Sequence, residues 1–244
     1  MKSMQGYVTL ALLCASLTIT LNSCSSDNGA QAQSPATDRA AQNRFVNPAY
    51  LEKVSPQNAT LIMVDYLTGF DPGLKTIPKP LYLKNVSALA QLGKIFKLPT
   101  IILGDEGGFR GTFYKEIDQY LPNAPKIDRH APSAWAEPRF VKQVADYGRK
   151  KLIIAGISID NCVTQLSIDA LKAGYEVYVV VDVSGSDEKL VEQAAMMRLT
   201  QAGAVMTSWV SLASELMDDW NTPEGPLVGK LYAENSAWGG NMPK

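Results

Sequence analysis

The chain of 244 residues has few of the side chains on which reactive sites are commonly built, with three cysteines and one histidine. It also lacks an excess of charge of either sign, because its formal charge at pH 7 is −1. That balance, without any basic patch, argues against a nucleic-acid partner. No internal repeat and no second shift in composition occur along the chain, which excludes repeat architectures and favours one main domain.

Two of the three cysteines, Cys14 and Cys24, fall in an N-terminal segment that is typical of a secretion signal. Lys2 precedes an apolar stretch that ends in LNSC, and the Thr and Ser residues within it favour cleavage over a permanent membrane span. LNSC also resembles a bacterial lipobox, in which Cys24 becomes the lipidated first residue of the mature chain. The alternative is an ordinary secretory signal with an incidental cysteine. We therefore predict a signal peptide over residues 1–24 and an exported protein, periplasmic or anchored to a bacterial membrane.

The residues after Cys24 are rich in Ser, Ala, Gln and Asn, and the stretch SSDNGAQAQSPATDRAAQNR has no large apolar side chain. Such a composition cannot bury enough surface to offset the entropy of ordering. We predict a disordered tether over residues 25–45. The following residues 46–225 suffice for one domain with a substantial core, and residues 226–244 form a C-terminal tail with little periodicity.

The main domain contains five short runs of aliphatic and β-branched residues that are continuous instead of alternating with polar ones. Continuous apolar runs are typical of strands buried on both faces, as in a parallel sheet covered by helices. The segments between the runs are long enough for crossover helices, and most end in Gly or Pro. We predict a three-layer α/β/α fold with a mainly parallel, Rossmann-like sheet. The strands are predicted at residues 60–65, 99–104, 151–156, 176–182 and 204–208, and the helices at 81–97, 137–148, 161–174, 187–203 and 211–220.

In such a fold the functional side chains lie at the carboxyl ends of the strands. Asp65 ends the first apolar run, and Cys162 follows the third run, where the next helix begins with Ser158 and Asp160 as candidate caps. Amides at a helix N-terminus favour a thiolate and could also hold an oxyanion. This turn could therefore supply both a nucleophile and an anion hole. The structural alternatives are Asp65 as the cap of a turn and Cys162 as a small buried hydrophobe.

Three segments together resemble a known family. VDYLTGF, RHAPSAW and IIAGISIDNCV are similar, in this order, to the three motifs of the isochorismatase-like cysteine hydrolase superfamily, and residues 55–222 resemble its YcaC-type branch. The resemblance implies a triad with Cys162 as nucleophile, Asp65 as base and Arg129 as the cation. Most of the superfamily has lysine at this last position. Because a guanidinium cannot shuttle protons, proton transfer falls to Asp65. Lys126 is an alternative third member.

The resemblance also implies the surroundings of the triad. Attack by Cys162 on a small amide, carbamoyl or related carbonyl compound would pass through a thioester, with the oxyanion held by the amides of Asn161 and Cys162. An unusual, often cis, peptide is implied in the turn formed by Ile157, Ser158 and Ile159. A homo-oligomer is implied as well. Aromatic residues are more often core than pocket wall, but three could line this pocket: Phe70, Phe109 and Trp135.

No cofactor and no catalytic metal are predicted. Nicotinamidases, which are relatives in this superfamily, bind a metal partly through histidines of an Asp-x-His loop, whereas this chain has GDEGG there and His130 as its single histidine. Asp105 and Glu106 could still bind a hard cation weakly. Two other functions stay open: a redox or peroxidatic thiol protein, which would lack a resolving cysteine, and a ligand-binding lipoprotein that has lost turnover.

Overall fold

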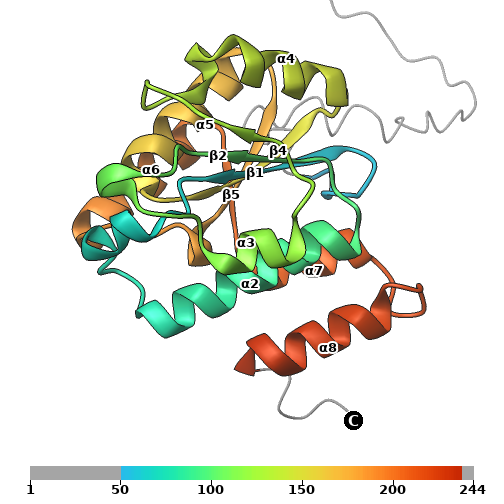
Figure 1. Ribbon diagram of the computed structural model, residues 1–244. Helices are drawn as coiled ribbons and strands as arrows, with labels where there is room; N and C mark the ends of the chain where they lie inside the picture. The colour runs from blue at the N-terminus through green and yellow to red at the C-terminus, as the bar shows by residue number, and fades with distance from the viewer. Residues whose placement is uncertain (1–50, 238–244) are drawn as a thin grey trace, which may run out of the picture. The chain divides into compact units, whose positions relative to one another are not determined.

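The computed structural model describes residues 51–237, which are drawn in colour in Figure 1. The predicted signal peptide with Cys14 and Cys24, the predicted tether and residues 238–244 lie outside the described residues. Within residues 51–237, no helix is both long and apolar enough to cross a membrane.

Six parallel strands form one sheet in the order β3-β2-β1-β4-β5-β6. This confirms the predicted fold class, and each of the five apolar runs contains one strand. The sequence does not predict β3, because this strand has only two residues and lies in a polar segment after Pro125. The strands are β1 (Ala59–Val64), β2 (Thr100–Leu103), β3 (Lys126–Ile127), β4 (Lys151–Gly156), β5 (Glu176–Val180) and β6 (Val205–Thr207).

Helices cover both faces of the sheet, as Figure 1 shows. Successive residues of a strand point to opposite faces, so Leu61 and Met63 of β1 join one core while Ile62 and Val64 join the other. Burial on both faces explains why the runs are continuously apolar. The first core is covered by α2 (Lys79–Ile95), α3 (Lys115–Tyr120), α7 (Trp209–Met217) and α8 (Gly225–Asn235), and the second by α4 (Pro138–Tyr147), α5 (Thr164–Lys172) and α6 (Lys189–Ala202).

The five predicted helices are present, and Gly148 and Gly203 end α4 and α6 in the left-handed conformation that favours glycine. The tail predicted after residue 225 begins with α8, so the packed domain extends further than the sequence indicates. Val228 and Leu231 on α8 are buried in the first core. Tyr232 adds a hydrogen bond of 2.9 Å from its hydroxyl to the carbonyl of Val210 on α7.

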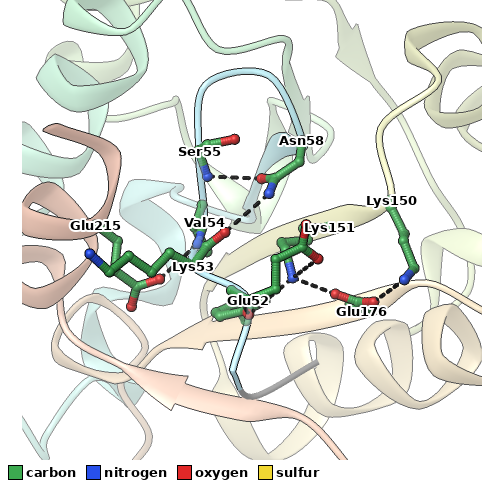
Figure 2. Close-up of polar contacts among 10 residues, drawn as sticks. Glu52, Lys53, Val54, Ser55, Asn58, Lys150, Lys151, Glu176 and Glu215 are labelled. Atoms are coloured by element: carbon green, nitrogen blue, oxygen red, sulfur yellow. Dashed lines mark hydrogen bonds and ion pairs between the residues drawn. The ribbon is translucent and has the colours of Figure 1, made fainter. Parts of the chain in front are cut away.

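The segment that leads into β1 is held at the amino edge of the sheet by polar contacts (Figure 2). Val54 N donates to Glu215 Oε2 at 2.8 Å, and Lys53 pairs with Asp218 at 2.8 Å. Near the amino ends of β4 and β5 lies a group of residues that we call the basal cluster. The Lys151 side chain at its centre is completely buried and pairs with Glu176 and, at 3.1 Å, with Glu52. The basal cluster consists of Glu52, Lys150, Lys151, Glu176 and Tyr178.

Candidate active site

The site lies where the strand order of the sheet reverses. β1 lies between β2 and β4, and the helices that follow β1 and β4 cover opposite faces. Such a switch point leaves a crevice at the carboxyl ends of the two strands. Val64 ends β1 beside Gly156, and Ile157 N donates to Val64 O at 3.0 Å. A Cβ on Gly156 would lie 2.0 Å from Val64 O, so only glycine allows the strand ends to approach this closely.

Asp65 leaves β1 with a φ of 52°, a left-handed conformation that aspartate tolerates better than most residues. Main-chain bonds hold this turn, because Asp65 N donates to Leu103 O at 2.9 Å and Leu67 N donates to Asp65 O at 2.7 Å. The residue is only 4% exposed. Its carboxylate accepts a hydrogen bond from the Arg129 guanidinium and lies near the Cys162 thiol, which acts on its pKa. The side chain therefore faces the other two residues of the implied triad instead of capping its own turn.

Arg129 follows β3 and reaches Asp65 across the end of β2. Its side chain is 9% exposed, and Nη2 forms the ion pair with Asp65. Nη1 donates to the carbonyls of Ala131 and Pro132, which fixes the direction of the guanidinium. Lys126, the alternative third member, pairs with Asp118 at 2.8 Å and lies over the Phe113 ring. Arg129 is thus the cation that the fold brings to Asp65.

Cys162 lies in the turn Ile159–Val163 (η5), which connects the end of β4 to α5. The Ile157–Ser158 peptide before this turn is cis, at the position that the family resemblance implies. Arg129 and Asp65 both lie close enough to the thiol to act on its pKa, in opposite directions. Residues from the ends of β1, β3 and β4 therefore meet at one point.

Burial dominates the electrostatics of this group. It raises the pKa of Cys162 above its ordinary value, against the opposing effect of Arg129, and nearby Asp65 raises it further. Burial also raises the pKa of Asp65, while Arg129 and the Cys162 thiol act in the opposite direction. The thiolate expected from helix N-terminal amides is therefore not the resting form. A neutral thiol beside a carboxylate of raised basicity is suited to proton transfer at the moment of attack.

A cavity of about 340 Å³ opens in front of Cys162. Its volume is near the lower end for small-molecule sites. Another cavity, of about 500 Å³, lies at the amino edge of the sheet beside Val54 and Met217, and no cysteine lines it. The first cavity is lined by Asp65, Phe70, Gly73, Ile157, Ser158, Asp160, Asn161, Cys162, Ser186 and Asp187.

Two aromatic residues suggested as pocket walls, Trp135 and Phe109, do not line the cavity, and neither does Ile159 of the implied turn. Ile159 is completely buried in the second core, and its N–H donates to Gly185 O at 3.1 Å. Trp135 packs edge-on against Phe140, also in that core. Phe109 is 74% exposed and touches the pocket only indirectly, through an edge contact with Phe70. Ile159 and Trp135 lie within motifs, but packing in the second core takes up their side chains.

Three residues near the site are not predicted from the motifs: Ser186, Asp187 and Arg110. Ser186 and Asp187 follow β5, so the rule that sites gather at strand ends could have indicated them. Arg110 lies in the loop after β2 and lowers the pKa of Asp65 by its positive charge. This loop packs on the loop after β1, because a Cβ on Gly69 would lie 1.9 Å from Phe109 O. No sequence pattern signals that contact between loops.

The acidic loop after β2 is engaged in its own contacts. Asp105 pairs with Arg110 at 3.2 Å, and Glu106 accepts a hydrogen bond of 2.8 Å from Phe113 N. Across residues 51–237, no three His, Cys, Asp or Glu side chains gather in a way that could hold a metal ion. His130 is exposed, and its main-chain N–H donates to Glu137.

Comparison with known proteins identifies the family to which this chain belongs. The isochorismatase domain family matches residues 59–211. The probable hydrolase YcaC of Escherichia coli is 36% identical over 176 residues, which cover 71% of this chain and 85% of YcaC. The chain therefore belongs to the isochorismatase family of hydrolases.

Two solved structures of YcaC proteins are similar to this chain over most of their length. The E. coli protein, described as an octameric hydrolase of unknown specificity, has a TM-score of 0.72 at 34% identity and covers 75% of this chain and 90% of its own. YcaC from Pseudomonas aeruginosa, determined with hexane-2,5-diol and covalent acrylamide, has a TM-score of 0.74 at 35% identity and covers 78% and 95%. The resemblance to the YcaC-type branch is thereby confirmed.

Proposed function

We propose that the protein is a cysteine-nucleophile hydrolase of a small amide, carbamoyl or related carbonyl compound. The observation that carries this proposal is the meeting of Asp65, Arg129 and Cys162 after the ends of three different strands, with Asp65 and Cys162 lining one cavity. Covalent acrylamide in the P. aeruginosa relative supports a reactive nucleophile in a pocket that admits a small amide.

In the proposed reaction the Cys162 sulfur attacks the carbonyl carbon while its proton passes to Asp65. The oxyanion accepts from the main-chain amides of Cys162 and Asn161. In the structure, Asn161 N donates to Ser158 O at a long distance of 3.3 Å. During the reaction this N–H exchanges that contact for the stronger hydrogen bond to the charged oxygen. The C–N bond then breaks, Asp65 returns the proton to the leaving nitrogen, and an amine or ammonia departs from the thioester.

Water completes the cycle in the same cavity. Asp65 takes a proton from the water as its oxygen attacks the thioester carbon, and the C–S bond breaks to release the acid. The proton returns to sulfur, so the net change is one amide and one water converted to one acid and one amine. Arg129 stays charged throughout, orients Asp65 and offsets the negative charge that moves between the carboxylate and the sulfur.

Export, a lipid anchor on Cys24 and assembly into a homo-oligomer belong to the same proposal. The N-terminal sequence supports the first two, and the octamer of the E. coli relative supports the third. A redox function gains no support from the contacts of Cys162, because it is the only cysteine among residues 51–237.

Replacing Cys162 by Ala tests the proposed chemistry. Release of ammonia or amine from a panel of small amides should fall by at least about 10³-fold, because removing a nucleophile removes the covalent pathway. Circular dichroism and thermal unfolding should stay close to wild type, since Ala fits the space of the thiol. Turnover that survives in Cys162→Ala would refute the mechanism. If the wild type binds a ligand but never converts it, the result would favour the non-catalytic binding protein.

A further inference from the structure

The cavity in front of Cys162 has an acidic wall that the proposed chemistry does not use. Asp160 and Asp187 both line it, whereas no lysine or arginine does. The charge of Asp65 is offset by Arg129. Among the described residues, neither Asp160 nor Asp187 forms an ion pair with a basic side chain. The space that a substrate must occupy is therefore negative.

Asp160 is held in place by a buried serine. Ser186 is 1% exposed, and its Oγ donates to Asp160 Oδ1 at 2.7 Å. The main chain of Ser186 is fixed in turn, because its carbonyl accepts from the N–H groups of Lys75 and Thr76, and its N–H donates to Thr76 Oγ1 at 3.0 Å. Asp187 is exposed and its Oδ1 lies 3.4 Å from the same hydroxyl. The hydrogen-bonded Ser186 thus places one half-buried and one exposed carboxylate along the cavity.

A metal ion is a poor occupant for this wall, because Asp160 and Asp187 gain no third His, Cys, Asp or Glu ligand within residues 51–237. An organic cation needs no such ligand set, since a protonated amine or guanidinium donates hydrogen bonds to one or two carboxylates. Phe70, which also lines the cavity, offers an aromatic ring of the kind on which such cations pack. An anionic substrate would be repelled by the same wall.

We propose that the substrate carries a protonated amine or guanidinium close to its reacting carbonyl, and that Asp160, assisted by Asp187, selects for this positive charge. Calling the bound molecule a substrate rests on the proposed hydrolase function, whereas the charge preference of the cavity does not. Asp160 should contribute more than Asp187, because Ser186 orients it and water screens it less.

Thiol reagents of opposite charge measure this preference without requiring turnover. The full chain is treated with 2-aminoethyl methanethiosulfonate, a cation, or 2-sulfonatoethyl methanethiosulfonate, an anion. Mass spectrometry of the peptide that contains Cys162 gives each labelling rate, and the cation-to-anion ratio is divided by the ratio for free 2-mercaptoethanol. For wild type we expect a normalised ratio of at least about 30, which should fall in 0.5 M NaCl.

Three aspartate variants locate the origin of the ratio. Asp160→Asn keeps an oxygen for the Ser186 hydroxyl and should lower the ratio about tenfold, and Asp187→Asn about threefold. Asp146→Asn removes the same charge from α4, where Asp146 pairs with Lys142 outside the cavity, and should leave the ratio within about twofold. A wild-type ratio near 1, or one that Asp160→Asn leaves unchanged, would overturn the inference.

Two amides of equal length then separate this inference from the proposed function. 4-Aminobutanamide is a cation at pH 7 and pentanamide is its neutral counterpart. We expect kcat/KM at least about tenfold higher for the cation, with most of that advantage lost in Asp160→Asn. Hydrolysis of both amides at equal rates would refute the charge selection and leave the hydrolase intact. A high labelling ratio without hydrolysis of either amide would support the acidic cavity and count against the hydrolase.

Discussion

At the scale of single residues, the site depends on two opposite charges buried together. Arg129 is fixed by the carbonyls of Ala131 and Pro132 and is paired with Asp65. Its positive charge opposes the rise in pKa that burial causes in both Asp65 and Cys162. An arginine here can therefore support the thiolate and the carboxylate by charge alone, without exchanging a proton.

Alkylation of Cys162 across pH tests this function of Arg129. Iodoacetamide reacts with the thiolate, so labelling accelerates as pH rises through the pKa of the thiol. Removing the positive charge in Arg129→Met raises that pKa further and should slow labelling at pH 8 several-fold, because a smaller fraction of the thiol is then ionised. Arg129→Lys keeps the charge and is the matched control. Peptide mass spectrometry supplies the rates, and equal pH profiles for wild type and Arg129→Met would contradict this assignment.

The triad residues could be predicted because each stands in a motif tied to the end of a strand. Arg110 and Ser186 could not, because their positions depend on how one loop packs on another. Likewise, sequence alone places Ile159 and Trp135 near the site without indicating that the core takes their side chains. Motif order thus predicts which residues meet beyond the strand ends better than it predicts the walls of a pocket.

At the scale of elements, Asp182 joins the end of β5 to the start of α7. Its Oδ1 accepts a hydrogen bond of 3.0 Å from Trp209 N, and burial raises its pKa to about 6. A raised carboxyl pKa contributes stability that is present below the unfolded value, near 3.9, and is lost as pH rises through about 6. Burial of the charged carboxylate therefore weakens the fold at neutral pH relative to mildly acidic pH, although the hydrogen bond from Trp209 N acts in the opposite direction.

Asp182→Asn keeps the acceptor for Trp209 N but removes the titration. The free energy of unfolding of the variant minus that of wild type should increase by about 2–3 kcal/mol from pH 4 to pH 7, so the variant becomes relatively more stable. Urea unfolding at several pH values measures this difference, and other titrating groups cancel in the comparison. A difference that does not vary with pH would show that Asp182 is not the titrating group.

The basal cluster offers two lysines that contact the same carboxylate at different depths. Lys151 is completely buried and Lys150 is 66% exposed, and both pair with Glu176 (Figure 2). Lys151→Met should lower the free energy of unfolding by about 2–3 kcal/mol, because it leaves Glu176 without its buried partner. Lys150→Met, the matched control, should cost less than about 0.5 kcal/mol. Equal losses in urea unfolding would argue against burial as the cause.

Strands and helices can be predicted from the sequence where their burial requires a recognisable pattern of apolar residues. The central strands are apolar on both faces and are recognised from short runs, whereas β3 is two residues long and pairs on one side only. The sequence predicts a tail in place of helix α8 because the buried residues of this helix, among them Val228 and Leu231, are few and separated by Gly and Lys. Packing against α2 and α7 supplies the stability that the pattern does not reveal.

At the scale of the whole domain, the segment that leads into β1 and the cavity of Cys162 lie at opposite ends of the strands. Residues 52–58 lead into β1 at the amino edge, where Glu52, Lys53 and Val54 are each held by a residue distant in sequence. The cavity of Cys162 opens at the carboxyl edge, beyond the ends of β1 and β4. We therefore expect that removal of the sequence before residue 45 leaves the described residues of the cavity wall in place.

Deleting residues 1–44 tests this separation. Because Glu52, Lys53 and Val54 remain, the shortened chain should keep its amino-edge contacts and its free energy of unfolding within about 0.5 kcal/mol, as expected for changes away from buried features. The rate of Cys162 alkylation and kcat/KM for small amides should stay within about twofold. A longer deletion, of residues 1–58, also removes Glu52, Lys53 and Val54. This shorter chain should unfold at much lower urea concentrations. A tenfold loss of kcat/KM on deletion of residues 1–44 alone would show that the N-terminal segment takes part in the site.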